Sequence, residues 1–174
     1  ILEAALSSMK SVGNWSGVTV SAKHAGLKKK YIPNEMDIQI VDLPGTYSIS
    51  PFTSEEAITR DYILAESPDV IINIVDGANL SRSLFFTTQL VELGIPVVIA
   101  LNKSDILAKR GDSTDVSALK KELHCPIVPI SARMEKGISE LINEAIKRFH
   151  EKEPQTATRF YLENKDHSDI ARQK

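Results

Sequence analysis

Cysteine is nearly absent from this chain of 174 residues. The single Cys125 excludes an internal disulfide and leaves no cysteine spacing typical of a zinc site. The apolar run at residues 126–130 follows it directly, which favours a small core side chain over a reactive thiol. The four histidines are scattered without the spacing of metal ligands, so we expect no metal–histidine site.

A strong net charge and long apolar runs are also lacking. The formal net charge is −2, so no basic field favours nucleic acid as a partner. No apolar run reaches the length of a membrane span, and no signal peptide is visible. The hydrophobic content of 42% and charged content of 25% are typical of a globular domain with one core. We expect the chain itself to be soluble, and it can still be a piece of a larger protein.

The stretch Ile-Gln-Ile-Val-Asp-Leu-Pro-Gly at residues 38–45 predicts a buried strand that ends at Asp42 and turns at Gly45. A carboxylate at the carboxyl end of a parallel strand faces the crevice where such sheets bind ligands. Asp42 can hold a hydrated Mg²⁺, and Gly45 lets a backbone N–H approach a phosphate oxygen. Taken alone, Asp-x-x-Gly is equally compatible with an ordinary turn after a strand.

Helical periodicity and short apolar runs alternate along the rest of the chain. The expected helices are residues 1–10, 53–66 and 80–93, one capped by Asp115, and one that follows Gly137. The expected strands are residues 36–42, 69–76, 95–102 and 126–131, preceded by a glycine-containing loop into a strand at 12–20 and a solvated hairpin end at 28–35. This order predicts a three-layer α/β fold with a doubly wound, mostly parallel sheet. The domain should span residues 1–150, followed by a polar tail or linker at residues 151–174.

The segment Asn-Lys-Ser-Asp at residues 102–105 follows the third of these apolar strands. The Asp105 carboxylate can accept hydrogen bonds from adjacent N–H and NH₂ donors, which guanine has and adenine lacks. Asn102 can meet the N7 and O6 edge of the ring or brace the neighbouring loop, and the Lys103 stem can lie along the ring face. Residues 131–133 end the fourth strand, where a backbone N–H can reach the purine oxygen. Each motif alone could be a turn; together, at strand ends and in this order, they indicate a guanine site.

These motifs resemble those of a Ras-like P-loop GTPase domain of the translation-factor-related class. The segments at residues 12–20, 42–48, 73–76 and 89–94 narrow the resemblance. With them, residues 1–150 are closely similar to the cytosolic G domain of the FeoB family of bacterial ferrous-iron transporters. The family usually has Asn-Trp-Pro-Gly-Val-Thr, and Ser16 stands here in place of that proline.

The resemblance implies roles for individual residues. Thr19 would coordinate Mg²⁺ in the GTP state, Asp42 would hold the metal through water, and Gly45 would contact the γ-phosphate. The residues implied to bind the nucleotide are Gly45, Asn102, Lys103, Asp105, Ser131, Ala132 and Arg133. The residues implied to form two switches, within segments 12–20 and 43–52, are Asn14, Trp15, Gly17, Val18, Thr19, Leu43, Pro44 and Thr46. The γ-phosphate would order both segments.

Two features depart from Ras-type enzymes. The phosphate-loop motif Gly-x-x-x-x-Gly-Lys-Ser/Thr does not occur in the sequence. In the family this loop, with its strand, immediately precedes the helix matching residues 1–10. We therefore expect a chain truncated at its N-terminus, without the central strand between those matching residues 36–41 and 70–75. Thr46 stands where Ras-type enzymes carry a water-orienting glutamine, so no catalytic residue is assignable and hydrolysis would rest on positioning and charge stabilisation.

The implied function is guanine-nucleotide binding and GTP hydrolysis, with Mg²⁺, in the regulatory domain of a ferrous-iron membrane transporter. Its place would be the cytoplasmic face of the inner cell membrane, with the helical regulatory and transmembrane parts of the same transporter as partners. No nucleic acid is expected, and a homo-oligomer is compatible with the sequence. The alternative is a degenerate or truncated G-domain binding module with little or no hydrolysis. An ATPase is disfavoured by residues 102–105.

Overall fold

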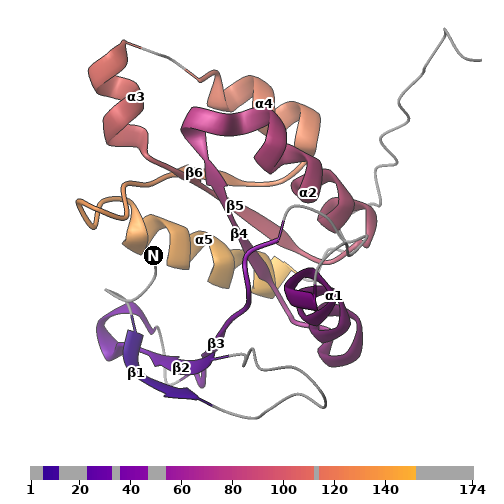
Figure 1. The fold of residues 1–174 in the computed structure, drawn as a ribbon. Helices are drawn as coiled ribbons and strands as arrows, with labels where there is room; N and C mark the ends of the chain where they lie inside the picture. The colour runs from indigo at the N-terminus through magenta and orange to yellow at the C-terminus, as the bar shows by residue number, and fades with distance from the viewer. Residues whose placement is uncertain (1–5, 12–22, 33–35, 47–53, 112–113, 152–174) are drawn as a thin grey trace, which may run out of the picture.

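The computed structural model describes residues 6–11, 23–32, 36–46, 54–111 and 114–151, and its strands form two sheets of three strands each. The antiparallel sheet, in the order β1-β2-β3, contains β1 (Leu6–Ser11), β2 (Lys23–Leu27) and β3 (Gln39–Asp42). The parallel sheet, in the order β4-β5-β6, contains β4 (Ile71–Asp76), β5 (Val97–Asn102) and β6 (Ile127–Pro129). Figure 1 shows the antiparallel sheet below the parallel one.

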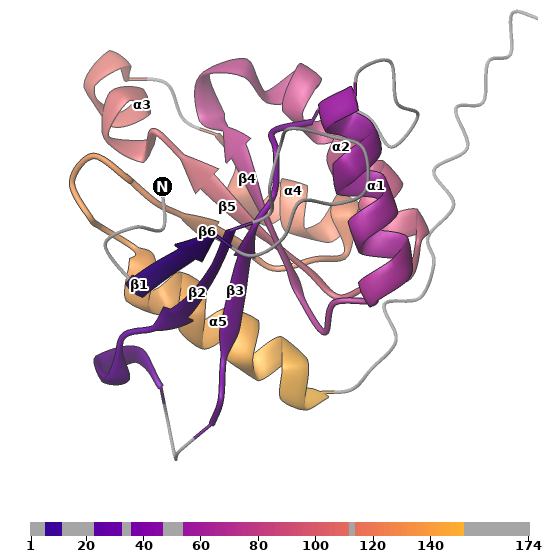
Figure 2. The same ribbon diagram turned by 60° about the horizontal axis from the view of Figure 1, so that its bottom comes forward.

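Helices cover both faces of the parallel sheet, which confirms the predicted α/β class. The described helices are α1 (Ser54–Glu66), α2 (Leu80–Glu92), α3 (Ser104–Arg110), α4 (Val116–Leu123) and α5 (Ile138–Glu151), with short 3₁₀ turns η2 (Lys29–Tyr31) and η3 (Gly77–Asn79). Side chains of α1, α2 and α4 pack on one face of the sheet, and those of α5 pack on the other. Figure 1 shows α5 between the parallel sheet and the strands β1 to β3, and in Figure 2 the strand β3 crosses in front of α5. Among the described helices, none is both long and apolar enough to cross a membrane.

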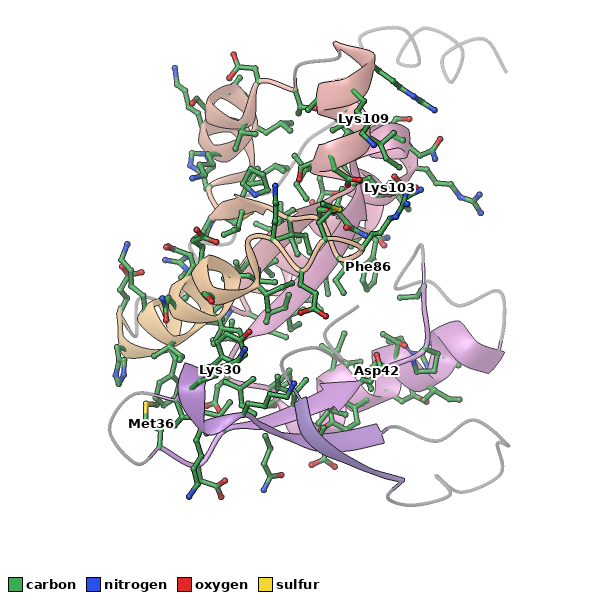
Figure 3. All side chains as sticks on the ribbon, turned by 90° about the vertical axis from the view of Figure 1, so that its left-hand side faces the viewer. Lys30, Met36, Asp42, Phe86, Lys103 and Lys109 are labelled. Carbon is green, nitrogen blue, oxygen red and sulfur yellow. The ribbon has the colours of Figure 1, made fainter. Side chains whose placement is uncertain are left out.

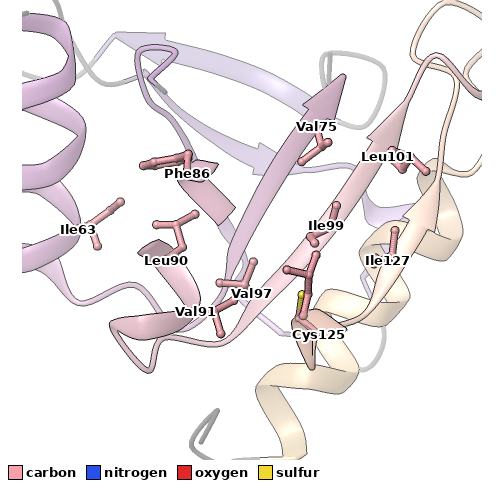
Figure 4. Close-up of a cluster of buried hydrophobic side chains, with 11 residues drawn as sticks. Ile63, Val75, Phe86, Leu90, Val91, Val97, Ile99, Leu101, Cys125 and Ile127 are labelled. Atoms are coloured by element: carbon pink, nitrogen blue, oxygen red, sulfur yellow. The ribbon is translucent and has the colours of Figure 1, made fainter. Parts of the chain in front are cut away.

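The strand β5 is the centre of the core because its side chains are buried on both faces. Val97, Ile99 and Leu101 point into the cluster with α1, α2 and α4, shown in Figure 4. Val98 and Ala100 point to the opposite side, where they meet α5. A continuous apolar run is what a parallel strand covered on both faces requires, so this prediction is confirmed.

The predicted helix at residues 1–10 is wrong for the part that the structure describes. Residues Leu6–Ser11 form the strand β1, which pairs with β2 in antiparallel register. Three serines in these six residues weaken the helical preference, since serine hydroxyls compete for backbone hydrogen bonds. In the strand, pairing with β2 satisfies the backbone N–H and C=O groups instead. This long-range pairing outweighs the helical spacing of the apolar residues. Residues 12–20, the predicted loop into a strand, lie outside the described residues.

The described strands on either side of the expected gap do not pair with each other. We predicted that the strands at residues 36–42 and 69–76 would not pair directly, and within the described residues β3 pairs with β2 and β4 pairs with β5. The predicted hairpin end is confirmed by the antiparallel pairing of β2 with β3 and by the turn η2 between them. The single mostly parallel sheet of the prediction is thus two sheets, one of them antiparallel.

Candidate functional site

The segment after β5 changes direction at Lys103 and begins a short helix. Lys103 has a left-handed backbone with φ of 68°, and its carbonyl accepts hydrogen bonds from Ile106 and Leu107 at 2.9 and 3.1 Å. Ser104 ties this turn to the end of the next strand, because its N–H and its hydroxyl both donate to the Ile130 carbonyl. The helix α3 was not predicted, since only the turn was expected from the motif.

Asp105 lies in the first turn of α3 and remains partly accessible to solvent. A hydrogen bond from the Ser131 side chain is the main cause that lowers the pKa of Asp105 below its ordinary value, and the charges of Lys109 and Arg133 add to it. The side chain of Ser131 is buried, with 1% exposed. The structure therefore brings together the predicted residues Asp105, Ser131 and Arg133.

Asn102 takes the second of its two predicted roles and braces the neighbouring loop. Its Oδ1 accepts a hydrogen bond from the Ala132 N–H at 3.1 Å. The Ser131 N–H donates to the Lys136 carbonyl at 3.1 Å. We predicted that a backbone N–H of this loop would be available to a purine oxygen, yet both of these donors have acceptors within the protein. The backbone of Ala132 is therefore positioned by Asn102 rather than left as an open donor.

The strand β4 contributes a carboxylate to the same end of the sheet. Asp76 is the register partner of Asn102 on β5. Its Oδ2 accepts a hydrogen bond from the Lys103 ammonium at 2.7 Å, and its Oδ1 accepts from the Ala78 N–H at 2.9 Å. Asn79 donates to the same carboxylate at 3.3 Å. The Lys103 contact is the main cause that lowers the pKa of Asp76.

The turn that follows β3 is held from a different element. Asp42 is exposed, and Leu43 packs against the core cluster of α2 and β5. The Thr59 hydroxyl on α1 donates to the Pro44 carbonyl at 2.9 Å, and the Thr59 side chain is buried. A Cβ built on Gly45 would meet no heavy atom within 4 Å, and its backbone is not in the left-handed region. Neither the space around position 45 nor its backbone conformation therefore requires glycine there.

The predicted site residues thus fall into two groups. Asn102, Lys103, Asp105 and residues 131–133 gather at the carboxyl end of the parallel sheet. Figure 3 shows Asp42 on the antiparallel sheet, apart from Lys103 on the parallel one. Thr19, Asn14, Trp15, Gly17 and Val18 lie outside the described residues.

Sequence reasoning missed two residues that the geometry singles out. Asp76 ends a predicted strand, as Asp42 does, so a signal for it was present in the pattern of strand-end carboxylates. Thr59 gave no such signal, because a threonine within an amphipathic helix is common and its contact with Pro44 spans 15 positions. Among the described residues, no group of three or more His, Cys, Asp or Glu side chains is placed to hold a metal ion.

A parallel sheet with helices on both faces, and polar motifs that follow β3, β5 and β6, defines a Ras-like G domain. The family model for ferrous iron transport protein B matches residues 1–145. The chain belongs to this family, FeoB, and corresponds to its N-terminal domain.

Curated relatives carry the same family name. The chain is 46% identical over 147 residues to a protein of Porphyromonas gingivalis, described as an Fe(2+) transport protein A/Fe(2+) transporter FeoB fusion protein. That alignment covers 84% of this chain and 17% of the relative. The chain is 42% identical over 144 residues to the Fe(2+) transporter FeoB of Staphylococcus aureus, covering 83% of this chain and 21% of the relative. It thus spans about a fifth of the length of these relatives.

Solved structures of the same family share the fold. A GDP-bound mutant of S. thermophilus NFeoB superposes with a TM-score of 0.75 at 40% identity, covering 90% of this chain and 57% of that one. The cytosolic domain of L. pneumophila FeoB gives a TM-score of 0.75 at 38% identity, covering 84% of this chain and 61% of that one. The S. thermophilus protein bound to mGMPPNP gives a TM-score of 0.73 at 42% identity, covering 86% of this chain and 56% of that one.

Proposed function

We propose that this domain binds guanine nucleotides at the carboxyl end of the parallel sheet, through Asp105. The observation that carries the proposal is the position of the Asp105 carboxylate in the first turn of α3, next to the loop at residues 131–133 that Asn102 braces. Its two oxygens match the adjacent N1–H and N2–H₂ donors of guanine. The NFeoB protein of S. thermophilus was solved as a mutant with GDP and in another structure with mGMPPNP, which supports the same ligand class here.

The phosphates and the metal would lie toward the turn after β3. Gly45 has open space where a Cβ would stand, so a ligand that approaches the bare backbone is the remaining physical reason for glycine there. Asp42 offers an exposed carboxylate, a hard oxygen donor suited to Mg²⁺, which keeps several waters and needs few protein ligands. Asp42 would hold Mg²⁺ through water, and Thr19 is the second candidate ligand. When bound, Mg²⁺ would neutralise charge that develops on the phosphates.

In the intact protein this domain would hydrolyse GTP and regulate a ferrous-iron transporter at the cytoplasmic face of the cell membrane. The family membership supports this assignment, and the helical and transmembrane parts of the same transporter would be its partners. The alternative is a module that binds nucleotide with little or no hydrolysis. The absence of the phosphate-loop motif from the sequence favours testing hydrolysis separately from binding.

The test of guanine recognition replaces Asp105 with asparagine. Asp105→Asn exchanges an acceptor pair for one acceptor and one donor, which matches xanthine instead of guanine. We expect weaker GTP binding by about tenfold or more and a gain for xanthosine triphosphate, measured by calorimetry. Asp115→Asn is the matched control, because Asp115 caps α4 away from the site and asparagine caps equally well. Preference for GTP retained in Asp105→Asn would contradict the proposal.

A further inference from the structure

The Lys103 side chain spans the ends of two neighbouring strands. Lys103 follows β5, and its ammonium reaches Asp76 at the end of β4 at 2.7 Å. The methylenes of its stem therefore cross the rim of the parallel sheet between the two strand ends. This stem is the part of Lys103 that can lie along the face of a purine ring.

Asp76 is itself held in place before any ligand binds. Its other oxygen accepts the Ala78 N–H at 2.9 Å, and Asn79 donates at 3.3 Å, so the turn η3 fixes the carboxylate. The backbone of Gly77 comes so close to Asn102 that a Cβ would lie 2.8 Å from the Asn102 carbonyl oxygen. The ends of β4 and β5 thus pack closely against each other, and Asp76 is hydrogen-bonded at the end of β4.

The Lys103–Asp76 ion pair contributes little to the stability of the fold, so its position at the strand ends needs another explanation. The Lys103 and Asp76 side chains are 42% and 30% exposed, and ion pairs with this exposure add little stability. A lysine side chain that is free in solution loses rotamer freedom when a ligand packs against it. A lysine already held by a carboxylate has lost much of that freedom in advance.

We propose that Asp76 is a positioning residue for the nucleotide base: it anchors the Lys103 ammonium, so that the lysine stem is ordered where the purine ring stacks. This inference rests on the proposed binding of guanine nucleotide at residues 102–105. Asp76 contacts the Lys103 ammonium, so in this proposal its effect on nucleotide affinity passes through the lysine. Removing the carboxylate matters only while the ammonium is present.

The test is a double-mutant cycle on guanine-nucleotide affinity. Asp76→Asn keeps an oxygen for the Ala78 N–H and removes the charge, while Lys103→Met keeps an apolar stem without the ammonium. We expect Asp76→Asn to weaken GDP binding about three- to tenfold when Lys103 is present, and by less than about twofold in the Lys103→Met background. Equal losses in both backgrounds would show a structural role and overturn the inference.

Two further measurements separate the possible outcomes. Asp61→Asn breaks the solvent-exposed Arg60–Asp61 pair on α1, which has the same length of 2.7 Å, and should leave GDP affinity unchanged. NMR of the Lys103 ammonium in the protein without nucleotide should show an ordered side chain that Asp76→Asn releases. A mobile ammonium in the unmodified protein overturns the inference by itself. Absence of GDP binding by the unmodified protein overturns the proposed function as well, whereas binding without coupling overturns only the role of Asp76.

Discussion

The two polar ends of this domain are supported in different ways. The end of the parallel sheet, with residues 102–105 and 131–133, rests on a strand whose side chains from Val97 to Leu101 are all buried. Its polar groups are joined to one another across the strand ends, from Asp76 to Lys103 and from Asn102 to Ala132. The turn at residues 42–46 follows a strand that is only partly buried, and the Thr59 hydroxyl on α1 ties it to the rest of the fold.

This difference matches the two tasks that a nucleotide site has to perform. A base-recognition site discriminates best when its donors and acceptors are fixed in advance. A segment that responds to the γ-phosphate has to change its order when the phosphate is lost, so it is drawn from the less stable part of a fold. We therefore expect stability to lie mainly at the end of the parallel sheet and responsiveness to the γ-phosphate mainly in the turn at residues 42–46.

The largest expected effect is on the core beneath the proposed base site. Ile99→Ala removes a side chain that is 1% exposed at the centre of β5, and we expect a loss of about 4 kcal/mol in the free energy of unfolding. Ile40→Ala removes a partly buried side chain on β3, with an expected loss of about 2 kcal/mol or less. Urea unfolding of both variants gives the comparison. Equal losses would mean that the two sheets contribute alike, contrary to the division described above.

The next effect separates a glycine that the fold needs from one that it does not. Gly137 has φ of 77°, and a Cβ there would lie 2.5 Å from the Pro129 carbonyl oxygen, so we expect Gly137→Ala to cost about 3 kcal/mol. Gly45→Ala should change the free energy of unfolding by less than about 0.5 kcal/mol, because nothing lies within 4 Å of the added carbon. The same variant should weaken binding of a non-hydrolysable GTP analogue about tenfold more than binding of GDP, measured by fluorescence titration. Equal weakening of both nucleotides would remove Gly45 from the γ-phosphate contact.

The parallel sheet was predictable from the sequence because each of its elements carries its own local signal. The strand β5 is continuously apolar, α4 begins at the Asp115 cap, and α5 repeats its apolar side chains at helical spacing after Gly137. These signals depend on near neighbours, so they can be interpreted without knowledge of the tertiary structure. Residues 102–105 and 131–133 lie at or just beyond strand ends, and their gathering at one edge of the sheet could be expected from that position.

The rest of the fold depends on contacts between distant residues. Leu6–Ser11 form a strand because β2 lies beside them, and no local pattern in the sequence specifies that partner strand. The left-handed backbone of Lys103 lets α3 begin at Ser104, although lysine has no special preference for that conformation. The partner of Lys103 is Asp76, 27 positions away, and a pattern of residue types does not specify such a pair.

The smallest effect concerns the hydrogen bond that holds the turn after β3. Thr59→Val keeps the shape of a buried side chain but removes the donor to the Pro44 carbonyl, so we expect a loss of about 1 kcal/mol in the free energy of unfolding. Because Gly45 follows Pro44 directly, a looser turn must be ordered again when the γ-phosphate binds. The affinity for a GTP analogue should therefore fall about threefold relative to GDP, while the preference for guanine over xanthine stays unchanged. Thr59→Ser restores the hydroxyl and should recover the ratio of the two affinities. If valine lowers both affinities equally and serine does not restore them, Thr59 supports the core alone and the turn at residues 42–46 is positioned by other contacts.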